Sequence, residues 1–329
     1  MPHALVPALL IAIAAAAHAP QAWTAAQDAA KNYPNRPVRL VLAQTTGSSV
    51  DTLSRVLASK LGDELGQQFV TDNRGGAGGT IGAEIAAHAV PDGYTLLATS
   101  TGVQVIAPQI YKKLNYHPVR DFAQISLFAI TQNVLVTHPG LPLKSVKELI
   151  AYAKANPGKL NMANAGSGFQ SHLAGVLFTH MTEIDVLHVP YKGGASLIAV
   201  MGNEAQLTIA PGPAVLGHVR AGRLRALATG GEKRSPLTPE LPTVIEAGVP
   251  GYVSTGWAGV MAPKATPKPI LDKLHAGIVK VINDPATREM IERQGGEPVT
   301  SAPAEFTKFI GQEYARFSQA ISIAKLKVE

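Results

Sequence analysis

The sequence predicts an α/β protein of two domains built on doubly wound sheets, and three observations point to this fold class. The chain has 329 residues, which is too many for one ordinary core and fits about two domains of roughly 100–200 residues each. Short β-rich runs alternate with helical patterns, and this alternation predicts parallel sheets covered by helices. Loops rich in glycine, serine and threonine separate several strands from the helices that follow them.

The first predicted domain starts after a linker, with a buried strand at Val38–Ala43. A polar turn follows, and the next helix carries an apolar stripe formed by Val50, Leu53, Val56, Leu57, Leu61 and Leu65. Gly66 ends this helix. The remaining elements of the domain are predicted as a strand at Gln68–Thr71, a helix at Gly78–Ala89 and a strand at Thr95–Thr99.

The second predicted domain begins near Gln132 and repeats the alternation. Its strands are expected at Val134–Thr137, Leu160–Ala163, Val186–Val189, Gln206–Ala210 and Leu224–Thr229. Its helices are expected at Val146–Ala155, Gln170–Met181, Leu197–Met201 and Val215–Arg220.

From Trp257 onward the pattern becomes helical. Two apolar stripes mark the helices: Leu271, Leu274, Ile278 and Ile282 form one, and Phe306, Phe309, Ile310 and Phe317 form the other. We expect this helical end to pack back on the first domain, so that the chain crosses between domains near 130–138 and 250–257. The expected role of Trp257 is packing.

Residues 1–26 are predicted to be a secretory signal peptide. Leu5–Ala17 is an uncharged apolar run that is shorter than the ~20 residues needed to span a bilayer, and small residues follow it. The cleavage point stays open between Ala19, Thr24 and Ala26. The alternatives are a disordered apolar tail or a buried first helix.

The composition excludes several classes of protein. The chain has no cysteine, which excludes disulfide frameworks, thiolate metal sites, cysteine nucleophiles and a lipid anchor on cysteine. The net charge of +6 is spread along the chain without an aromatic-interleaved basic stripe, so no nucleic-acid partner is expected. We also expect no cofactor and no metal, because no cofactor motif or compact ligand cluster is complete.

Three loops join predicted strands to predicted helices and could carry chemistry: Gln44–Ser49, Gly75–Thr80 and Ala165–Gly168. A helix start has free N–H groups and the positive end of the helix dipole, so it favours a carboxylate or a phosphate. Open α/β sheets also bind ligands beyond the carboxyl ends of their strands. A tight turn without a ligand is the alternative for each loop, but two loops from two domains facing one crevice would be more specific.

Catalytic motifs are incomplete in this sequence. Asn164–Gly168 fails the G-x-S-x-G pattern because it begins with Asn. An exported hydrolase or isomerase that uses Ser167 with His172 or His188 is nevertheless the alternative from another functional class. It lacks a recognisable set of acid, base and nucleophile.

The chain also carries an ordered series of motifs at compatible spacing. They are Tyr33-Pro34-x-Arg36-Pro37, Gly47 with Asp51, Asn73-Arg74-x-Gly76-Ala77-Gly78-Gly79-x-Ile81-Gly82, Pro91-Asp92-Gly93-Tyr94-Thr95-Leu96-Leu97, Asp121-Phe122, Gly166-x-Gly168 with His172-Leu173, His188-Val189-Pro190-Tyr191-Lys192-Gly193, Gly222-Arg223-Leu224-Arg225-Ala226-Leu227-Ala228 and Glu246-Ala247-Gly248-Val249-Pro250-Gly251-Tyr252. Through these motifs, which cover Tyr33–Phe317, the chain resembles the periplasmic substrate-binding proteins of tripartite tricarboxylate transporters, the TctC or Bug family.

The resemblance implies a two-lobed periplasmic binding protein, type II-like, with a hinge and a central ligand cleft. Residues 27–131 and 252–329 would form lobe 1, and residues 132–251 would form lobe 2. It also implies a small carboxylate as ligand, transporter membrane subunits as partners, and a periplasmic location. We expect a monomer without catalytic activity. A ligand-sensing partner of a membrane sensor is a further alternative.

In this family the carboxylate is held mostly by backbone N–H groups and ordered waters. Mapped onto this sequence, the ligand-binding residues are Gln44, Thr45, Thr46, Gly47, Ser48, Ser49, Asp51, Ser100, Thr101, Gly102, Ala165, Gly166, Ser167, Gly168, Ser171 and His172. Helix starts from two lobes would then clamp one anion. Asp51 would order a water or a ligand donor, or alternatively stabilise the first turn of its helix.

Overall fold

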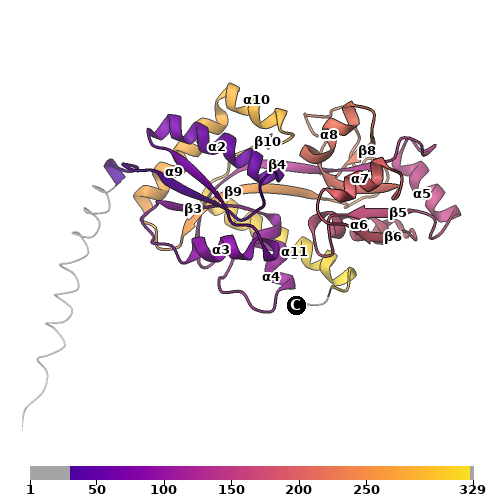
Figure 1. Ribbon diagram of the computed structural model, residues 1–329, viewed down its shortest axis with the longest axis horizontal. Coiled ribbons are helices and arrows are strands. Elements are labelled where there is room, and N and C mark those ends of the chain that lie inside the picture. Colours follow the sequence, from indigo (N-terminus) through magenta and orange to yellow (C-terminus); the bar gives the residue numbers. More distant parts are fainter. Residues whose placement is uncertain (1–29, 327–329) are drawn as a thin grey trace, which may run out of the picture.

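The computed structural model describes residues 30–326 and shows a two-lobed mixed α/β protein (Figure 1). The strands of lobe 1 are β1 (Val38–Leu42), β2 (Phe69–Asn73), β3 (Thr95–Ser100), β4 (Phe122–Thr137), β9 (Thr255–Pro263) and β10 (Glu297–Pro298). Its helical elements are α2 (Ser49–Leu65), η1 (Ala77–Gly79), α3 (Thr80–Ala87), η2 (Gly102–Ile106), α4 (Ala107–Ile110), α9 (Lys268–Asn283), α10 (Pro285–Arg293) and α11 (Pro303–Ile323). The signal peptide predicted for residues 1–26 lies outside the described residues.

Lobe 2 continues from the end of β4. Its strands are β5 (Asn161–Asn164), β6 (Leu187–Pro190), β7 (Leu207–Pro211) and β8 (Arg225–Thr229). Its helices are α5 (Val146–Ala155), α6 (Gln170–Thr182), α7 (Ala195–Met201) and α8 (Gly212–Arg220). The strand order through both lobes is β2-β1-β3-β9-β4-β7-β5-β6, and β8 and β10 also pair with β4.

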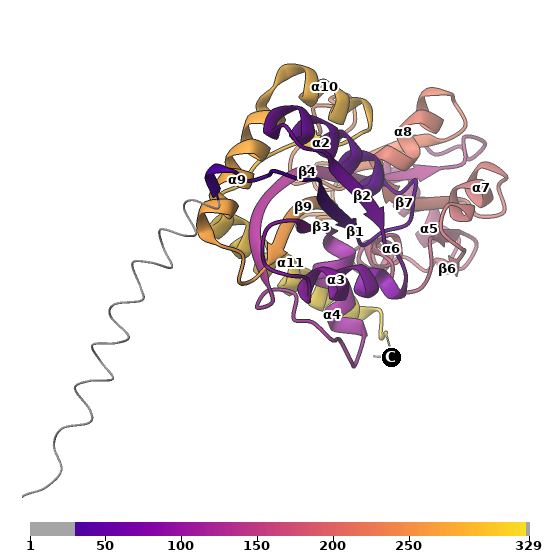
Figure 2. The ribbon, with the colours of Figure 1, turned by 60° about the vertical axis from the view of Figure 1, so that its left-hand side comes forward.

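Helices cover both faces of the lobe 1 sheet (Figure 2). Leu40 and Leu42 of β1 pack into one buried cluster with residues of α2 and α9. Val41, which points to the opposite face, belongs to a second cluster that includes residues of α3 and α11. The alternation of side chains along β1 therefore supplies two cores from one strand.

The prediction of parallel sheets is correct for two groups of strands, one in each lobe, and wrong for the pairings of β4 and β9. β1 pairs in parallel with β2 and β3, and β5 pairs in parallel with β6 and β7. In contrast, β9 runs antiparallel to β3 and β4, and β4 runs antiparallel to β7 and β8.

The sequence pattern misses β9 and the first part of β4 for physical reasons. Gly256 and Gly259 weaken the strand pattern of β9, but a Cβ at Gly259 would collide with the ring of Phe306. Ser126 is a fully buried polar residue within β4, and its hydroxyl accepts a hydrogen bond from Ser301 N at 3.1 Å. These residues suit a strand only because of partners that are distant in the sequence.

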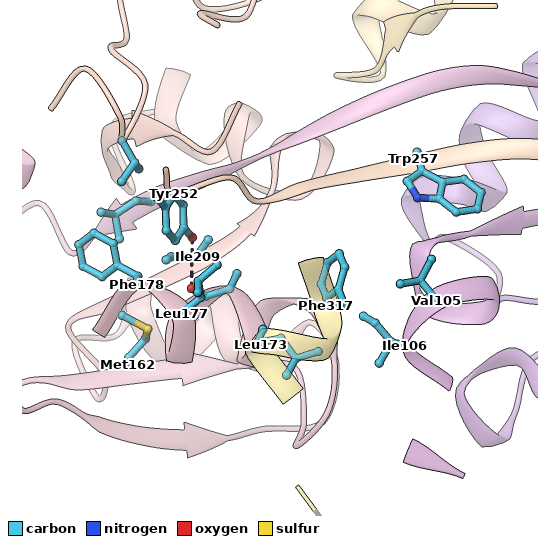
Figure 3. Close-up of a cluster of buried hydrophobic side chains, with 14 of the residues drawn as sticks. Val105, Ile106, Met162, Leu173, Leu177, Phe178, Ile209, Tyr252, Trp257 and Phe317 are labelled. Carbon is cyan, nitrogen blue, oxygen red and sulfur yellow. Dashed lines mark hydrogen bonds between the residues drawn. The ribbon is translucent and has the colours of Figure 1, made fainter. Parts of the chain in front are cut away.

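The helical C-terminal segment packs on lobe 1, and α11 also reaches lobe 2. Phe306, near the start of α11, meets Trp257 of β9 edge-on, with ring centroids 5.4 Å apart. Trp257 is 2% exposed, so its side chain packs as predicted. Phe317, further along α11, belongs to the same buried cluster as Leu173 and Leu177 of α6 (Figure 3). The two lobes therefore share apolar packing along α11.

The chain passes between the lobes at two neighbouring positions. β4 pairs with β9 as far as Gln132, and from Asn133 onward it pairs with β7. The other passage, at Ser254, lies beside Asn133: Asn133 Nδ2 donates to Ser254 Oγ at 2.6 Å, and Asn133 N donates to Ser254 O at 3.2 Å. The two connecting segments are therefore hydrogen-bonded to each other.

Candidate functional site

A cleft of about 500 Å³ lies between the lobes. Its walls come from the loops after β1, β2 and β3 in lobe 1 and after β5, β6 and β7 in lobe 2. All these loops follow the carboxyl ends of parallel strands, which is where open α/β sheets bind ligands. Loops from both lobes therefore face one space.

Most of the binding residues predicted from the sequence line this cleft. They are Gln44, Thr45, Ser48, Ser49, Ser100, Thr101, Gly102, Ala165, Ser167, Gly168 and Ser171. Thr46, Gly47, Asp51, Gly166 and His172 do not line it. Four of these five make hydrogen bonds that hold the lining loops: Gly47, Asp51, Gly166 and His172.

Further residues line the cleft that the sequence did not single out for binding. The apolar ones include Ile110, Tyr111, Phe169 and Leu197. They stand in or beside helices, where an apolar residue predicts packing, so no signal in the sequence distinguishes them from core residues. The glycine loop at 75–79, noted in the sequence as a helix start, lines the cleft as well.

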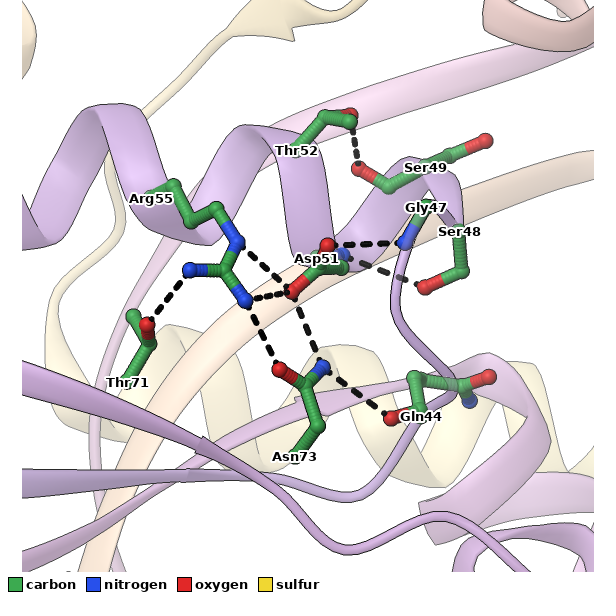
Figure 4. Close-up of polar contacts among 9 residues, drawn as sticks. All are labelled: Gln44, Gly47, Ser48, Ser49, Asp51, Thr52, Arg55, Thr71 and Asn73. Atoms are coloured by element: carbon green, nitrogen blue, oxygen red, sulfur yellow. Dashed lines mark hydrogen bonds and ion pairs between the residues drawn. The ribbon is translucent and has the colours of Figure 1, made fainter.

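Asp51 organises the loop in front of α2 (Figure 4). Its carboxylate is 2% exposed and accepts hydrogen bonds from Gly47 N at 2.8 Å, Arg55 Nε at 3.0 Å and Asn73 Nδ2 at 2.9 Å. Ser48 caps the helix, because its Oγ accepts from Asp51 N at 3.2 Å. These bonds hold the loop on the first turn of α2, and Asp51 itself does not line the cleft, which favours the structural alternative for Asp51.

The charge of Asp51 is stabilised where it stands. Burial by itself raises the pKa of this carboxyl group, but the hydrogen bonds from Arg55, Gly47 and Asn73 favour the charged form and together hold the pKa below its ordinary value. The carboxylate is therefore ionised at neutral pH and holds the loop in place.

The loops after β1 and β3 are joined beside the cleft. Gln44 Nε2 donates to Ser100 Oγ at 3.1 Å. The next residue, Thr101, is 1% exposed and lines the cleft, and its Oγ1 has no hydrogen-bond partner among residues 30–326. A buried hydroxyl without a partner is costly, so Thr101 is a candidate for contact with a bound group.

Neutral acceptors hold the loop in front of α6. Ala165 N donates to Ser171 Oγ at 3.0 Å, and Gly166 N donates to Asn164 Oδ1 at 3.0 Å. Gly168 N donates to His172 Nδ1 at 3.2 Å. The amides of Ala165, Gly166 and Gly168 are therefore already used within the protein.

His172 and His188 lie edge-on, with ring centroids 5.8 Å apart. Burial lowers the pKa of His172, and burial together with the neighbouring His172 lowers the pKa of His188 to about 4. His172 is therefore neutral at pH 7 and can accept from Gly168, while His188 Nε2 lies 3.2 Å from Thr179 Oγ1. In the described part of the chain no hydrogen bond joins Ser167 to either ring, so the serine–histidine pair of the hydrolase alternative is not formed.

The starts of α2 and α6 present uncommitted amides from opposite lobes. In α2 the N–H groups of Ser49 and Val50 make no hydrogen bond within residues 30–326. The same is true within this range of the N–H groups of Gln170 and Ser171 in α6. All four residues line the cleft. Together with the positive ends of two helix dipoles, these amides are suited to an anion.

Residues 30–326 contain neither a metal-binding cluster nor a membrane-spanning helix. These residues contain no group of three or more His, Cys, Asp or Glu side chains that could hold a metal ion. Among the same residues, no helix combines the length and the apolar character that crossing a membrane requires.

Known proteins are similar to this chain in sequence. The family model described as tripartite tricarboxylate transporter family receptor, TctC, matches residues 53–326. Protein BugT of Bordetella pertussis is 37% identical over 310 residues, which cover 93% of this chain and 95% of BugT.

Known structures share the fold. The structure of Rpa4515 from R. palustris with adipate superposes with a TM-score of 0.82 at 34% identity, covering 90% of this chain and 99% of that protein. MatC (Rpa3494) from Rhodopseudomonas palustris with bound malate superposes with a TM-score of 0.76 at 29% identity, covering 88% and 100%. The chain therefore belongs to the TctC (Bug) family of tripartite tricarboxylate transporter receptors.

Proposed function

We propose that this chain is a periplasmic solute-binding protein that captures a small organic carboxylate between its lobes and delivers it to the membrane subunits of a tripartite tricarboxylate-type transporter. The observation that carries the proposal is the pair of helix starts, α2 and α6, whose uncommitted amides face one cleft from opposite lobes. The adipate and malate found with two relatives are carboxylates, which supports this ligand class. The protein acts as a monomer after removal of residues 1–26.

One carboxylate of the ligand binds between the two helix starts. Ser49 of α2 and Ser171 of α6 supply backbone donors, and the hydroxyl of Thr101 supplies another. The carbon skeleton then lies against Leu197 and Phe169. Phe169 is 55% exposed, and covering apolar area contributes roughly 25 cal/mol per Å². Asp51 and His172 position the loops without touching the ligand.

The lobes close on the ligand about the connecting segments at Asn133 and Ser254. In this proposal residues 27–131 and 252–329 form lobe 1, and residues 132–251 form lobe 2. Hinge closure of this kind takes the bound acid out of water, where hydrogen bonds to a charged group are stronger.

Catalysis plays no part in this function. The family consists of transport receptors rather than enzymes. The alternative of an exported hydrolase or isomerase that uses Ser167 with His172 or His188 is therefore wrong.

A thermal-shift screen tests the proposed function. Protein freed of ligand is heated with a panel of mono-, di- and tricarboxylates that includes aromatic acids. A ligand at 100 times its dissociation constant adds about 2.7 kcal/mol to the free energy of unfolding, so at least one acid should raise the melting temperature. Unchanged melting with every acid would contradict the proposal.

Substitution of Thr101→Val tests the site itself, by calorimetry with the acid that the screen identifies. The affinity should fall about tenfold, because the ligand loses a buried donor. The free protein should be equally stable or more stable, since an unpartnered hydroxyl is removed. Thr99→Val is the matched control: Thr99 is also buried without a hydroxyl partner among the described residues but does not line the cleft. Equal binding by both variants would exclude Thr101 as a ligand contact.

A further inference from the structure

The cleft is lined without charged side chains. Among the described residues that form its walls there is no Lys, Arg, His, Asp or Glu. The carboxylate of Asp51 stands behind the first loop, and its oxygens already accept hydrogen bonds from protein groups. Glu313 of α11 is fully buried and forms an ion pair with Arg316. Neither acid lines the cleft.

The helix starts that favour a carboxylate act against a cation. α2 and α6 both place the positive ends of their dipoles at the cleft, together with donor groups that an ammonium cannot use. A buried ammonium needs acceptors and a counter-charge, and burial of an unpaired charge is strongly unfavourable.

We infer that the cleft takes carboxylic acids without an amino group and rejects amino acids. This inference rests on the proposed function and narrows its ligand class. A second carboxylate on the ligand can use further neutral donors, such as the amides of the loop at Gly75–Gly79, which also lines the cleft. An ammonium group meets no corresponding anionic side chain.

A matched pair of ligands tests the inference. Adipate and 2-aminoadipate share one six-carbon skeleton and differ by a single amino group, and both are titrated calorimetrically at pH 7.5. We expect 2-aminoadipate to bind at least 100-fold more weakly. If the acid from the thermal screen is another one, it is compared with its own 2-amino derivative. Equal or tighter binding of the amino acid overturns the inference and leaves the proposed function intact, whereas failure of every acid to bind overturns both.

A gain of binding tests whether the lack of an anionic side chain in the cleft is the reason that amino acids are rejected. Ala214 is exposed, lines the cleft and stands in the first turn of α8, where an aspartate is favoured by the helix dipole. Ala214→Asp should strengthen binding of 2-aminoadipate at least tenfold and weaken binding of adipate. Gly217→Asp is the control with the same charge on the same helix, since Gly217 is exposed, has open space around its Cβ position and does not line the cleft. Identical responses of the two variants would overturn the proposed cause.

Discussion

The loops that begin α2 and α6 perform one task with different chemistry. Each presents two uncommitted amides to the cleft. The lobe 1 loop is held by a buried carboxylate, Asp51, which is paired with Arg55. The lobe 2 loop is held by uncharged acceptors, among them Ser171 Oγ and His172 Nδ1. The loop before a helix can therefore be fixed by charged or by neutral acceptors, and the kind of acceptor determines how the loop responds to pH.

The two loops should weaken at different pH. The pKa of Asp51 is lowered in the folded protein, so its stabilisation is present above the ordinary value of 3.8 and is lost as the pH falls through the lowered value. The pKa of His172 is also lowered, so the folded state favours the neutral ring. Its contribution is complete above the ordinary value of 6.5 and is lost as the pH falls through the lowered value. Because the ordinary value of His172 is the higher of the two, the lobe 2 loop should loosen first as the pH is lowered.

Removal of the Asp51 carboxylate should have the largest effect. Asp51→Ala leaves Gly47 N, Asn73 Nδ2 and the Arg55 guanidinium without their acceptor. We expect a loss of about 2–4 kcal/mol in the free energy of unfolding, measured by urea denaturation, and a large loss of ligand affinity.

The control for this variant is Asp63→Ala on the same helix. Asp63 is exposed and forms only a distant pair with Lys60, with 3.9 Å between Nζ and Oδ2. Its removal should change stability by less than about 0.5 kcal/mol. Similar effects of the two variants would show that the buried position of Asp51 is not what matters.

Mild acid should have the next largest effect, and it should act on the lobe 2 loop first. Hydrogen exchange of the protein, followed as the pH is lowered from 7 and corrected for intrinsic rates, should show protection at 165–172 lost at a higher pH than protection at 44–51. Ligand affinity should fall over the same range, because protonated Nδ1 of His172 cannot accept from Gly168 N. The lost hydrogen bond is worth about 1 kcal/mol.

His172→Asn separates this cause from general acid effects. Asparagine offers a neutral acceptor that does not titrate in this range. The variant should keep its affinity over the pH range in which the unsubstituted protein loses it. An unchanged pH dependence in the variant would assign the effect to another group, such as His188.

The hydroxyl caps should give the smallest effects, similar in the two loops. Ser48→Ala and Ser171→Ala each remove an acceptor for a loop or helix amide, and each should cost about 0.5 kcal/mol of stability and weaken ligand binding slightly. Ser145→Ala is the control: Ser145 Oγ caps α5 by accepting from Glu148 N at 3.1 Å, away from the cleft. It should lower stability by a similar amount and leave binding unchanged.

Local chemistry explains which parts of the fold could be predicted. The strand β1 and the helix α6 lie within a residue or so of their predicted bounds, because their apolar residues recur with a regular period. β9 carried no such pattern, because close neighbours require its glycines: the ring of Phe306 from α11 at Gly259, and the side chains of Thr131 and Gln170 at Gly256. The parallel sheets were expected from strand–helix alternation, and the antiparallel strands β4 and β9 correct that expectation.

The candidate site also contains residues that could be predicted from the sequence and residues that could not. The loops of glycine, serine and threonine before helices could be predicted from the sequence to favour an anion, because capping and dipole effects act within one turn of a helix. The wall residues Phe169 and Leu197 could not be predicted, since an apolar side chain beside a helix gives the same sequence pattern whether it faces a core or a cleft. For Asp51 the sequence left a ligand contact and a helix charge as alternatives, and its bond to Asn73, 22 residues away, could not be read from the sequence.

By itself, the sequence determined the class of fold, the helix starts and the family, because these depend on local propensity and on ordered short motifs. The tertiary structure alone decided which loops face one another, that α11 packs on both lobes, and that the cleft walls carry no charged side chain among the described residues. The physical reason is range. Caps and turns are formed by neighbours within four residues, whereas the bond from Asn73 to Asp51 and that from Gln170 to Thr255 O at 2.7 Å join residues far apart in the chain.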